Sequence, residues 1–355
     1  MKLFRPASIN QLSLKNRIVR SATWEGMCDA EGQPTARLID LYRQLVTGGV
    51  GLLISGYSYV RADGKQLAGK MGMDQDRLIP ALQKLTTAVH QAGGKTFCQL
   101  VHAGGLATVA APLAPSSLAE KPNVRAMTPQ DIAAIVSAFA SAAARAQGAG
   151  FDGVQLHGAH GYLINQFLSP LTNQRQDEYG GSLENRTRFL SEVYQAVRAA
   201  VGPDYPVTIK LTASDNIDGG FMLADALTVA GQLDSWGIDA IEVSSGTGAA
   251  GDLTPARQKI DSPAQEAYNA AHARAIKQVV KAPVMTVGGI RSPQLAEDLL
   301  VRGDADFVAM SRPLIREPDL ANQWQADFSH RATCISCNGC FRPGLKEGGI
   351  RCVLA

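Results

Sequence analysis

Eight short runs of β-forming residues, separated by longer stretches with helical periodicity, constrain the fold of this 355-residue chain most strongly. The runs cover residues 16–22, 50–56, 95–101, 151–157, 206–211, 239–244, 283–287 and 306–310. Such alternation is typical of parallel strands joined by helices. One helix is expected to start behind Thr128, with Pro129 first and Asp131 in its opening turn, because Ile132, Ile135, Val136 and Phe139 follow at helical spacing.

Two fold classes share this alternation, the doubly wound open sheet and the closed barrel. An open sheet usually carries a glycine-rich fingerprint after its first strand, and residues 16–23 contain none. Eight strands are the number that closes a barrel. We therefore predict a single (β/α)8 TIM barrel over residues 1–330, followed by a cysteine-containing extension over residues 331–355.

Composition and charge narrow the kinds of partner. The chain is 45% hydrophobic, enough for a large core, and its net charge of +2 comes from 34 basic and 32 acidic residues spread along the sequence. It lacks the clustered Lys and Arg of a nucleic-acid surface, the apolar core of a signal peptide and the roughly 18 apolar residues of a membrane span. We expect a cytoplasmic protein with a small-molecule partner, and homo-oligomers stay possible.

The predicted strand ends carry an unusual number of polar residues. In a (β/α)8 barrel the carboxyl ends of the strands form the site. These ends hold Ser21, Thr23, Gly56, Gln99, His157, His160, Lys210, Ser244, Ser245, Gly288, Gly289, Ser311 and Arg312. Each residue alone is equally typical of a solvated loop, but together they predict one ligand site.

Two imidazoles and a phenol leave one predicted strand within six residues, at His157, His160 and Tyr162. Imidazole N–H groups bind a carbonyl or an oxyanion, and a nearby phenol passes a proton. The alternative is a helix start whose histidines are satisfied in the core. We interpret the three residues as catalytic, because this chemistry needs all three groups around one pocket.

The residues that follow add a family resemblance. Residues 169–186 read SPLTNQRQDEYGGSLENR, and residues 157–186 as a whole resemble the central segment of the Old Yellow Enzyme family. These FMN-dependent NAD(P)H:flavin oxidoreductases include 2,4-dienoyl-CoA reductase and trimethylamine dehydrogenase. The resemblance runs from residue 16 to the C-terminal cysteines. It implies an FMN barrel that takes NADH or NADPH and reduces an activated C=C bond, with hydride from flavin N5 and a proton from Tyr162.

The resemblance also implies a role for each strand end. Gly288, Gly289, Ser311 and Arg312 would bind the FMN phosphate, since barrels commonly hold phosphate after strands seven and eight. Gln99 would meet the pyrimidine edge, and Lys210 would place a cation beside N1 and O2. Relatives usually carry Arg there, so the charge is kept and the planar fork is lost. Ser21, Ala22, Thr23 and Gly56 are expected to line the flavin.

The first strand departs from the family. Where ene reductases usually place Thr or Cys near flavin O4, this chain has Trp24, preceded by Thr23. Three interpretations stay open: Thr23 takes that role, the indole N–H takes it, or Trp24 is a wall of the substrate pocket.

The cysteines near the end of the sequence form a second motif. Cys334, Cys337 and Cys340 have C-x2-C-x2-C spacing, and Cys352 follows after eleven further residues. Three thiolates on a tight loop and a distant fourth suit [4Fe–4S], whereas zinc more often takes two separated C-x2-C pairs. The pattern also resembles the cluster loop of the dienoyl-CoA reductase and trimethylamine dehydrogenase branch, whose members continue into further nucleotide-binding domains. A [4Fe–4S] cluster, zinc and free thiols stay open.

Two other functions are compatible with part of the sequence. An aldolase-like barrel could form a Schiff base at Lys210, but it leaves Gln99 and the His-x-x-His-x-Tyr run without a role. An iron–sulfur flavoprotein dehydrogenase or electron-transfer subunit would use the cysteine loop to contact an electron-transfer partner. The whole pattern favours an FMN-dependent NAD(P)H:acceptor oxidoreductase.

Overall fold

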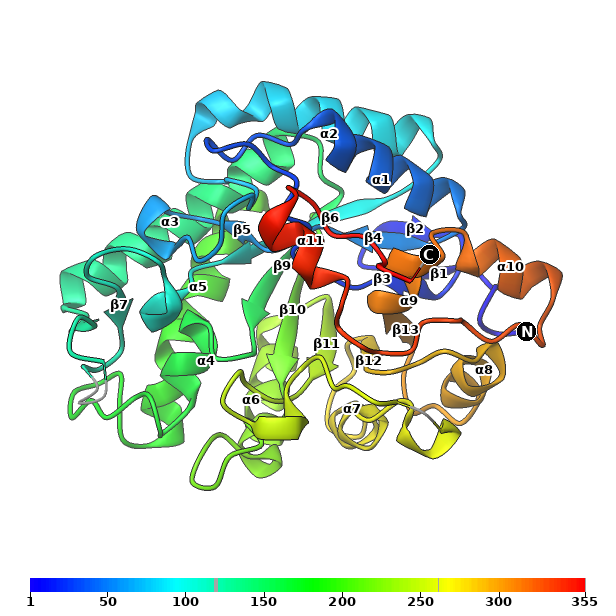
Figure 1. Ribbon diagram of the computed structural model, residues 1–355. Helices are drawn as coiled ribbons and strands as arrows, with labels where there is room; N and C mark the ends of the chain where they lie inside the picture. Colours follow the sequence, from blue (N-terminus) through cyan, green and yellow to red (C-terminus); the bar gives the residue numbers. More distant parts are fainter. Residues whose placement is uncertain (118–120, 261, 355) are drawn as a thin grey trace.

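Eight parallel strands close into a barrel in the computed structural model, which describes residues 1–117, 121–260 and 262–354 (Figure 1). The strands are β3 (Ile18–Arg20), β4 (Leu52–Ile54), β6 (Thr96–Val101), β9 (Gly153–Gly158), β10 (Val207–Thr212), β11 (Ala240–Ser244), β12 (Val284–Val287) and β13 (Phe307–Met310). The barrel closes because β13 pairs with β3, β3 with β4, and β4 with β6. Each predicted run overlaps one strand, and the predicted TIM barrel is confirmed.

Helices surround the strands on the outside (Figure 1). They are α1 (Ala36–Thr47), α2 (Ile79–Gln91), α3 (Pro129–Gly148), α5 (Leu183–Val201), α6 (Leu223–Trp236), α7 (Ala270–Lys277) and α8 (Pro293–Val301). After the last strand the chain forms α9 (Arg312–Arg316) at the strand's carboxyl end and then α10 (Leu320–Ala326). As predicted, α3 begins behind Thr128, whose side chain and that of Asp131 form a capping box. No helix within the described ranges combines the length and the apolar character needed to cross a bilayer.

A short hairpin covers the N-terminal end of the barrel. Its strands β1 (Ala7–Ile9) and β2 (Leu12–Leu14) pair antiparallel. The buried Ile9 and Leu14 pack with Phe97, Met285 and Phe307 inside the barrel. Three-residue strands leave little periodicity, which is why the sequence did not reveal this hairpin. A ligand must therefore enter from the opposite end, where the strands finish.

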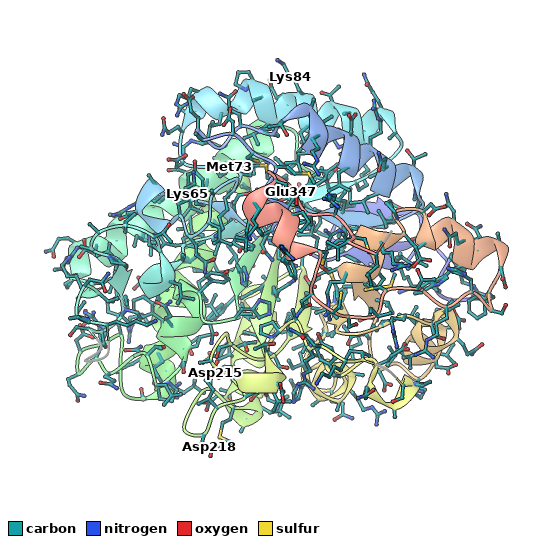
Figure 2. The ribbon with its side chains drawn as sticks, in the orientation of Figure 1. Lys65, Met73, Lys84, Asp215, Asp218 and Glu347 are labelled. Carbon is teal, nitrogen blue, oxygen red and sulfur yellow. The ribbon has the colours of Figure 1, made fainter. Side chains whose placement is uncertain are left out.

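The open end carries the irregular elements: β5 (Ser58–Tyr59), β7 (Leu113–Ala114), β8 (Arg125–Ala126), α4 (Leu163–Leu168) and α11 (Phe341–Lys346). In Figure 1 the red α11 lies in front of the strands, near the centre of the view. Figure 2 shows the same view with side chains, in which Glu347 marks the residue after α11. The extension thus folds back over the barrel.

Candidate active site

One cavity of about 550 Å³ collects nearly all of the predicted site residues. It is lined by Ser21, Ala22, Thr23, Trp24, Gln99, His157, His160, Tyr162, Lys210, Gly288, Gly289, Ser311 and Arg312, among others. Gly56 does not line this cavity. A Cβ on Gly56 would lie 2.0 Å from a carboxylate oxygen of Glu25, so the glycine serves packing behind the site.

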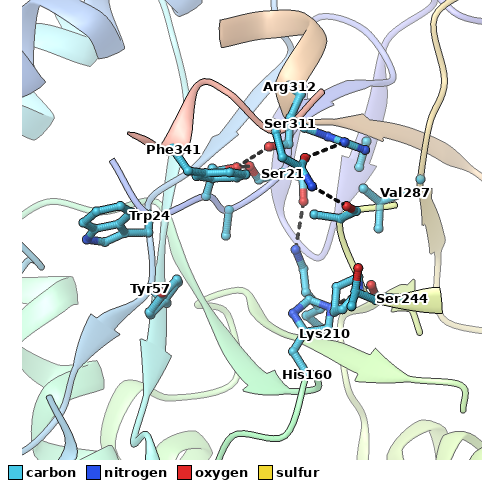
Figure 3. A pocket seen from close by; sticks show the side chains of 18 of the residues that line it. Ser21, Trp24, Tyr57, His160, Lys210, Ser244, Val287, Ser311, Arg312 and Phe341 are labelled. Atoms are coloured by element: carbon cyan, nitrogen blue, oxygen red, sulfur yellow. Dashed lines mark hydrogen bonds between the residues drawn. The ribbon is translucent and has the colours of Figure 1, made fainter. Parts of the chain in front are cut away.

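The three residues predicted to be catalytic form one wall of the cavity, where β9 ends. His157 lies within β9, His160 has a left-handed φ of 64°, and Tyr162 caps the start of α4. The ring centroid of His157 is 5.1 Å from that of His160 and 4.8 Å from that of Tyr162. His160 Nε2 lies 2.8 Å from Ser244 Oγ (Figure 3). The buried His157 Nδ1 has no partner among the described residues. The chain therefore brings the three groups together.

Burial sets the protonation of this wall. It lowers the pKa of His157 well below its usual value, with repulsion from His160 and Lys210 adding to the effect. Burial, and then Lys210, lowers the pKa of His160 to about 3. Burial raises the pKa of Tyr162. At neutral pH the wall consequently offers two neutral imidazoles and a phenol that keeps its proton.

Three residues behind Tyr162 were not predicted. The Tyr162 hydroxyl donates to Gln66 Oε1 at 2.7 Å, and Lys70 Nζ lies 3.8 Å from the ring centroid of Tyr57. Lys70 is only 1% exposed, and burial lowers its pKa. These residues belong to the long segment between β4 and α2, which has no regular periodicity. No sequence pattern pointed to them.

A buried network forms the floor of the cavity. Lys210 Nζ donates to Ser21 Oγ at 2.8 Å and lies 3.1 Å from Glu242 Oε1 (Figure 3 for Lys210 and Ser21). Gln155 Nε2 donates to the other Glu242 oxygen at 2.9 Å, and Gln99 Nε2 donates to Gln155 Oε1 at 2.7 Å. Sequence reasoning missed Gln155 and Glu242. Their signal was a polar side chain between two apolar residues of a buried strand.

The opposite end of the cavity has the properties of an anion site. Gly288 and Gly289 have φ values of 138° and 71°, and a Cβ on Gly288 would lie 2.6 Å from the ring of Tyr268. Arg312, at the start of α9, is buried, and its Nη1 donates to Asn338 Oδ1 at 2.7 Å. Backbone approach and a fixed guanidinium are what a phosphate needs. Tyr268 and Asn338 were not predicted.

Trp24 and the extension form one side of the cavity. The indole N–H of Trp24 donates to the Ala68 carbonyl at 3.0 Å, so this hydrogen bond does not point to a ligand. A Cβ on Gly344 would lie 2.9 Å from the Trp24 ring. Phe341 and Leu345 of α11 also line the cavity (Figure 3 for Trp24 and Phe341). This geometry favours the interpretation of Trp24 as a pocket wall.

The four cysteines of the extension line a second cavity of about 20 Å³. Arg312 and Asn338 line both cavities. All four thiols are free, and burial raises the pKa of Cys340 to about 11. Among the described residues, no three His, Cys, Asp or Glu side chains are grouped closely enough to hold a metal ion.

The larger cavity fits FMN on the chemistry of its donors. Gln99 Oε1 is a buried acceptor without a partner, as the N–H of a pyrimidine edge requires. Lys210 supplies a cation in the same cavity, and Gly288, Gly289 and Arg312 form the anion end. Fold and cavity together define the class of (β/α)8-barrel oxidoreductases that bind FMN at the carboxyl ends of the strands.

The chain belongs to the NADH:flavin oxidoreductase / NADH oxidase family, whose model matches residues 2–330. The predicted membership of the Old Yellow Enzyme family is thereby confirmed. An NADPH dehydrogenase of Geobacillus sp. (strain WCH70) is 37% identical over 89% of this chain and 91% of its own length. An NADH oxidase of Thermoanaerobacter brockii is 38% identical over 95% of this chain, but over only 53% of its own length.

Solved structures agree with this assignment. A 2-naphthoyl-CoA reductase complex superposes with a TM-score of 0.91 at 28% identity, covering 100% of this chain and 57% of that one. Morphinone reductase in complex with tetrahydroNAD superposes with a TM-score of 0.78 at 28% identity, covering 93% of this chain and 92% of that one. The chain thus spans little more than half the length of several relatives that it matches, and nearly all of others.

Proposed function

We propose that this protein is an FMN-dependent NAD(P)H oxidoreductase that reduces an activated C=C bond, as in an enone. Bound FMN would accept hydride from NAD(P)H and deliver it from N5 to the β-carbon. The observation that carries the proposal is the wall of His157, His160 and Tyr162 in the cavity that fits FMN. Similar proteins named NADPH dehydrogenase and morphinone reductase support the proposal.

The three residues of the wall have different roles in the proposed reaction. The N–H groups of His157 and His160 bind the substrate carbonyl oxygen and stabilise the negative charge that develops there. Tyr162 gives its proton to the α-carbon, and Gln66, 2.7 Å from the hydroxyl, orients the phenol. Because NAD(P)H and the enone use one pocket in turn, we expect ping-pong kinetics.

A side cavity supports a substrate larger than a simple enone. It measures about 370 Å³ and shares Leu106 and His160 with the main cavity. Its lining includes Val124, Leu171 and Ile217. We propose that an apolar substituent on the carbonyl compound occupies this space.

The test is a pair of anaerobic half-reactions. NADH or NADPH should bleach the 450 nm band of the FMN-loaded protein, and 2-cyclohexen-1-one should restore it with formation of cyclohexanone. Oxidation by oxygen alone, without that product, would reject the enone. A colourless protein that does not bind FMN, but is trapped at Lys210 by borohydride with a carbonyl compound, would favour the Schiff-base alternative.

A second proposal concerns the extension, residues 331–355. We propose that Cys334, Cys337, Cys340 and Cys352 are ligands of a [4Fe–4S] cluster that passes electrons to a further partner. The support is their spacing and their common cavity beside Arg312. The thiols would have to draw closer together around the cluster. Metal analysis is the test, argued at the end of the Discussion.

A further inference from the structure

A chain of side chains under the main cavity has a fixed direction of hydrogen bonding. Glu242, on β11, is fully buried and accepts from Ser21 Oγ at 2.6 Å through one oxygen and from Gln155 Nε2 at 2.9 Å through the other. Gln155, on β9 and also fully buried, accepts from Gln99 Nε2 at 2.7 Å. The last atom of the chain, Gln99 Oε1, is buried and has no partner among the described residues.

The carboxylate determines this direction. An ionised Glu242 can only accept hydrogen bonds, so Gln155 must turn its NH2 group toward it. The carbonyl oxygen of Gln155 then faces Gln99, which must donate a hydrogen bond to it from its own NH2 group. Gln99 is left with an acceptor at the cavity. Reversing either amide would put two acceptors or two donors in contact within a dry core, which is costly.

The same carboxylate faces the ammonium group of Lys210. Lys210 Nζ lies 3.1 Å from Glu242 Oε1 and donates to Ser21 Oγ at 2.8 Å. The ammonium group is thus held by a hydrogen bond to Ser21 and an ion pair with Glu242. A buried pair of opposite charges presents much less net charge to its surroundings than a lone cation does.

We propose that Glu242 is a positioning residue for the flavin, resting on the proposed FMN site. Acting through Gln155, it makes Gln99 an acceptor for the flavin N3–H. Acting on Lys210, it offsets the positive charge beside N1 and O2, and so keeps the reduced anionic flavin from being overstabilised. The class of ligand that this floor selects is a flavin with a hydrogen-bond donor at position 3.

The first test compares FMN with 3-deaza-FMN, in which a C–H replaces the N3–H without added bulk. Dissociation constants are measured by fluorescence with the flavin-free protein. Wild type should bind 3-deaza-FMN at least tenfold more weakly, because a buried acceptor loses its donor. In Glu242→Gln the chain can reverse, and the preference should fall to within about threefold. Equal preference in both proteins would overturn the orienting role.

The second test measures the two-electron midpoint potential of bound FMN with reference dyes. Glu242→Gln should stabilise reduced over oxidised flavin at least tenfold, a positive shift of about 30 mV for a two-electron couple. Glu242→Asp keeps the carboxylate and should stay near wild type. An unchanged or more negative potential in Glu242→Gln would overturn the charge role.

Two further variants separate the orienting role of Glu242 from its charge role. Gln155→Met breaks the chain of hydrogen bonds but leaves Glu242 beside Lys210. The preference for FMN over 3-deaza-FMN should therefore be lost, while the midpoint potential stays unchanged. This variant also tests the orienting role if Glu242→Gln does not fold. Glu25→Gln removes another buried glutamate, one that bonds Tyr42 at 3.2 Å, and should change neither measurement. If wild type binds neither FMN nor 3-deaza-FMN, the proposed function is contradicted. If it binds both equally, only the proposed role of Glu242 is contradicted.

Discussion

Single residues decide which chemistry the wall of His157, His160 and Tyr162 can support. Tyr162 keeps its proton because burial raises its pKa, and it lies beside two histidines that burial keeps neutral. Tyr162→Phe should therefore retain FMN and its reduction by NAD(P)H, but slow reoxidation by an enone by about 10²-fold or more, the usual loss for a missing general acid. Stopped-flow absorbance separates the two steps. Equal slowing of both would remove Tyr162 as proton donor.

The buried histidines also couple stability to pH. Unfolded histidine titrates near 6.5, whereas the pKa of native His160 is about 3. Between these values the unfolded chain binds more protons than the native protein, so stability rises with pH and is lost as pH falls below 6.5. His160→Asn should reduce the loss between pH 7 and pH 4.5 by about 1–3 kcal/mol. Urea unfolding of the flavin-free protein measures it, and an unchanged slope would contradict the prediction.

At this scale the sequence predicted the three residues of the wall but not the groups that support them. His157, His160 and Tyr162 were predictable because they lie within six residues of one another, in and directly after the end of one predicted strand. Glu242 was not, because a single acidic residue in an apolar run does not show which partner compensates it. Its partner Lys210 lies on the neighbouring strand, in register with it. Only the paired strands bring such groups together.

At the scale of elements, the proposed phosphate end of the site lies at the junction of β13 and α9. Arg312 lies there, buried and bonded to Asn338. Arg312→Ala should weaken FMN binding by about 1.5–3 kcal/mol, the contribution of a charge-assisted contact. Fluorescence titration of the flavin-free protein measures the change. Arg316→Ala, on the same helix but outside the main cavity, is the matched control. Equal affinities in both variants would place the phosphate elsewhere.

The short 3-10 helix Gly104–Leu106 borders both the main and the side cavity. Its Leu106 lines both of them. Leu106→Trp should narrow their junction and raise KM about tenfold for enones with a long alkyl substituent. This increase corresponds roughly to the free energy of burying two methylene groups. Turnover of 2-cyclohexen-1-one should change less than twofold. Steady-state kinetics with both substrates provides the test, and equal effects would mean that the side cavity is not used.

Regular elements were predictable and short ones were not. The eight barrel strands lie inside buried runs flanked by helices, so both periodicity and order identified them. The β1–β2 hairpin and the five elements at the open end are two to six residues long. Elements of this length are stabilised by tertiary contacts rather than by their own sequence, as with Gly344 of α11 against Trp24.

At the scale of the whole molecule, the extension joins the barrel at the proposed flavin site. Asn338 bonds Arg312, and Phe341 and Leu345 line the cavity. The cysteine cavity therefore borders the proposed FMN phosphate through Arg312. A redox centre held there would lie next to the flavin, which is the arrangement that electron transfer between the two would need.

The cysteines give the prediction that tests this arrangement. If Cys334, Cys337, Cys340 and Cys352 hold [4Fe–4S], anaerobically prepared protein should contain about four irons per FMN, by the composition of that cluster. Cys337→Ser should abolish iron binding and leave the flavin in place, because Cys337 is exposed and does not line the main cavity. Cys98→Ser is the control and should keep its iron, because Cys98 is a buried thiol of β6, outside the extension. Air should bleach the cluster and leave a yellow protein. One zinc in place of iron, or four titratable thiols in metal-free anaerobic protein, would overturn the cluster and leave the FMN barrel as the only redox centre that we propose for this chain.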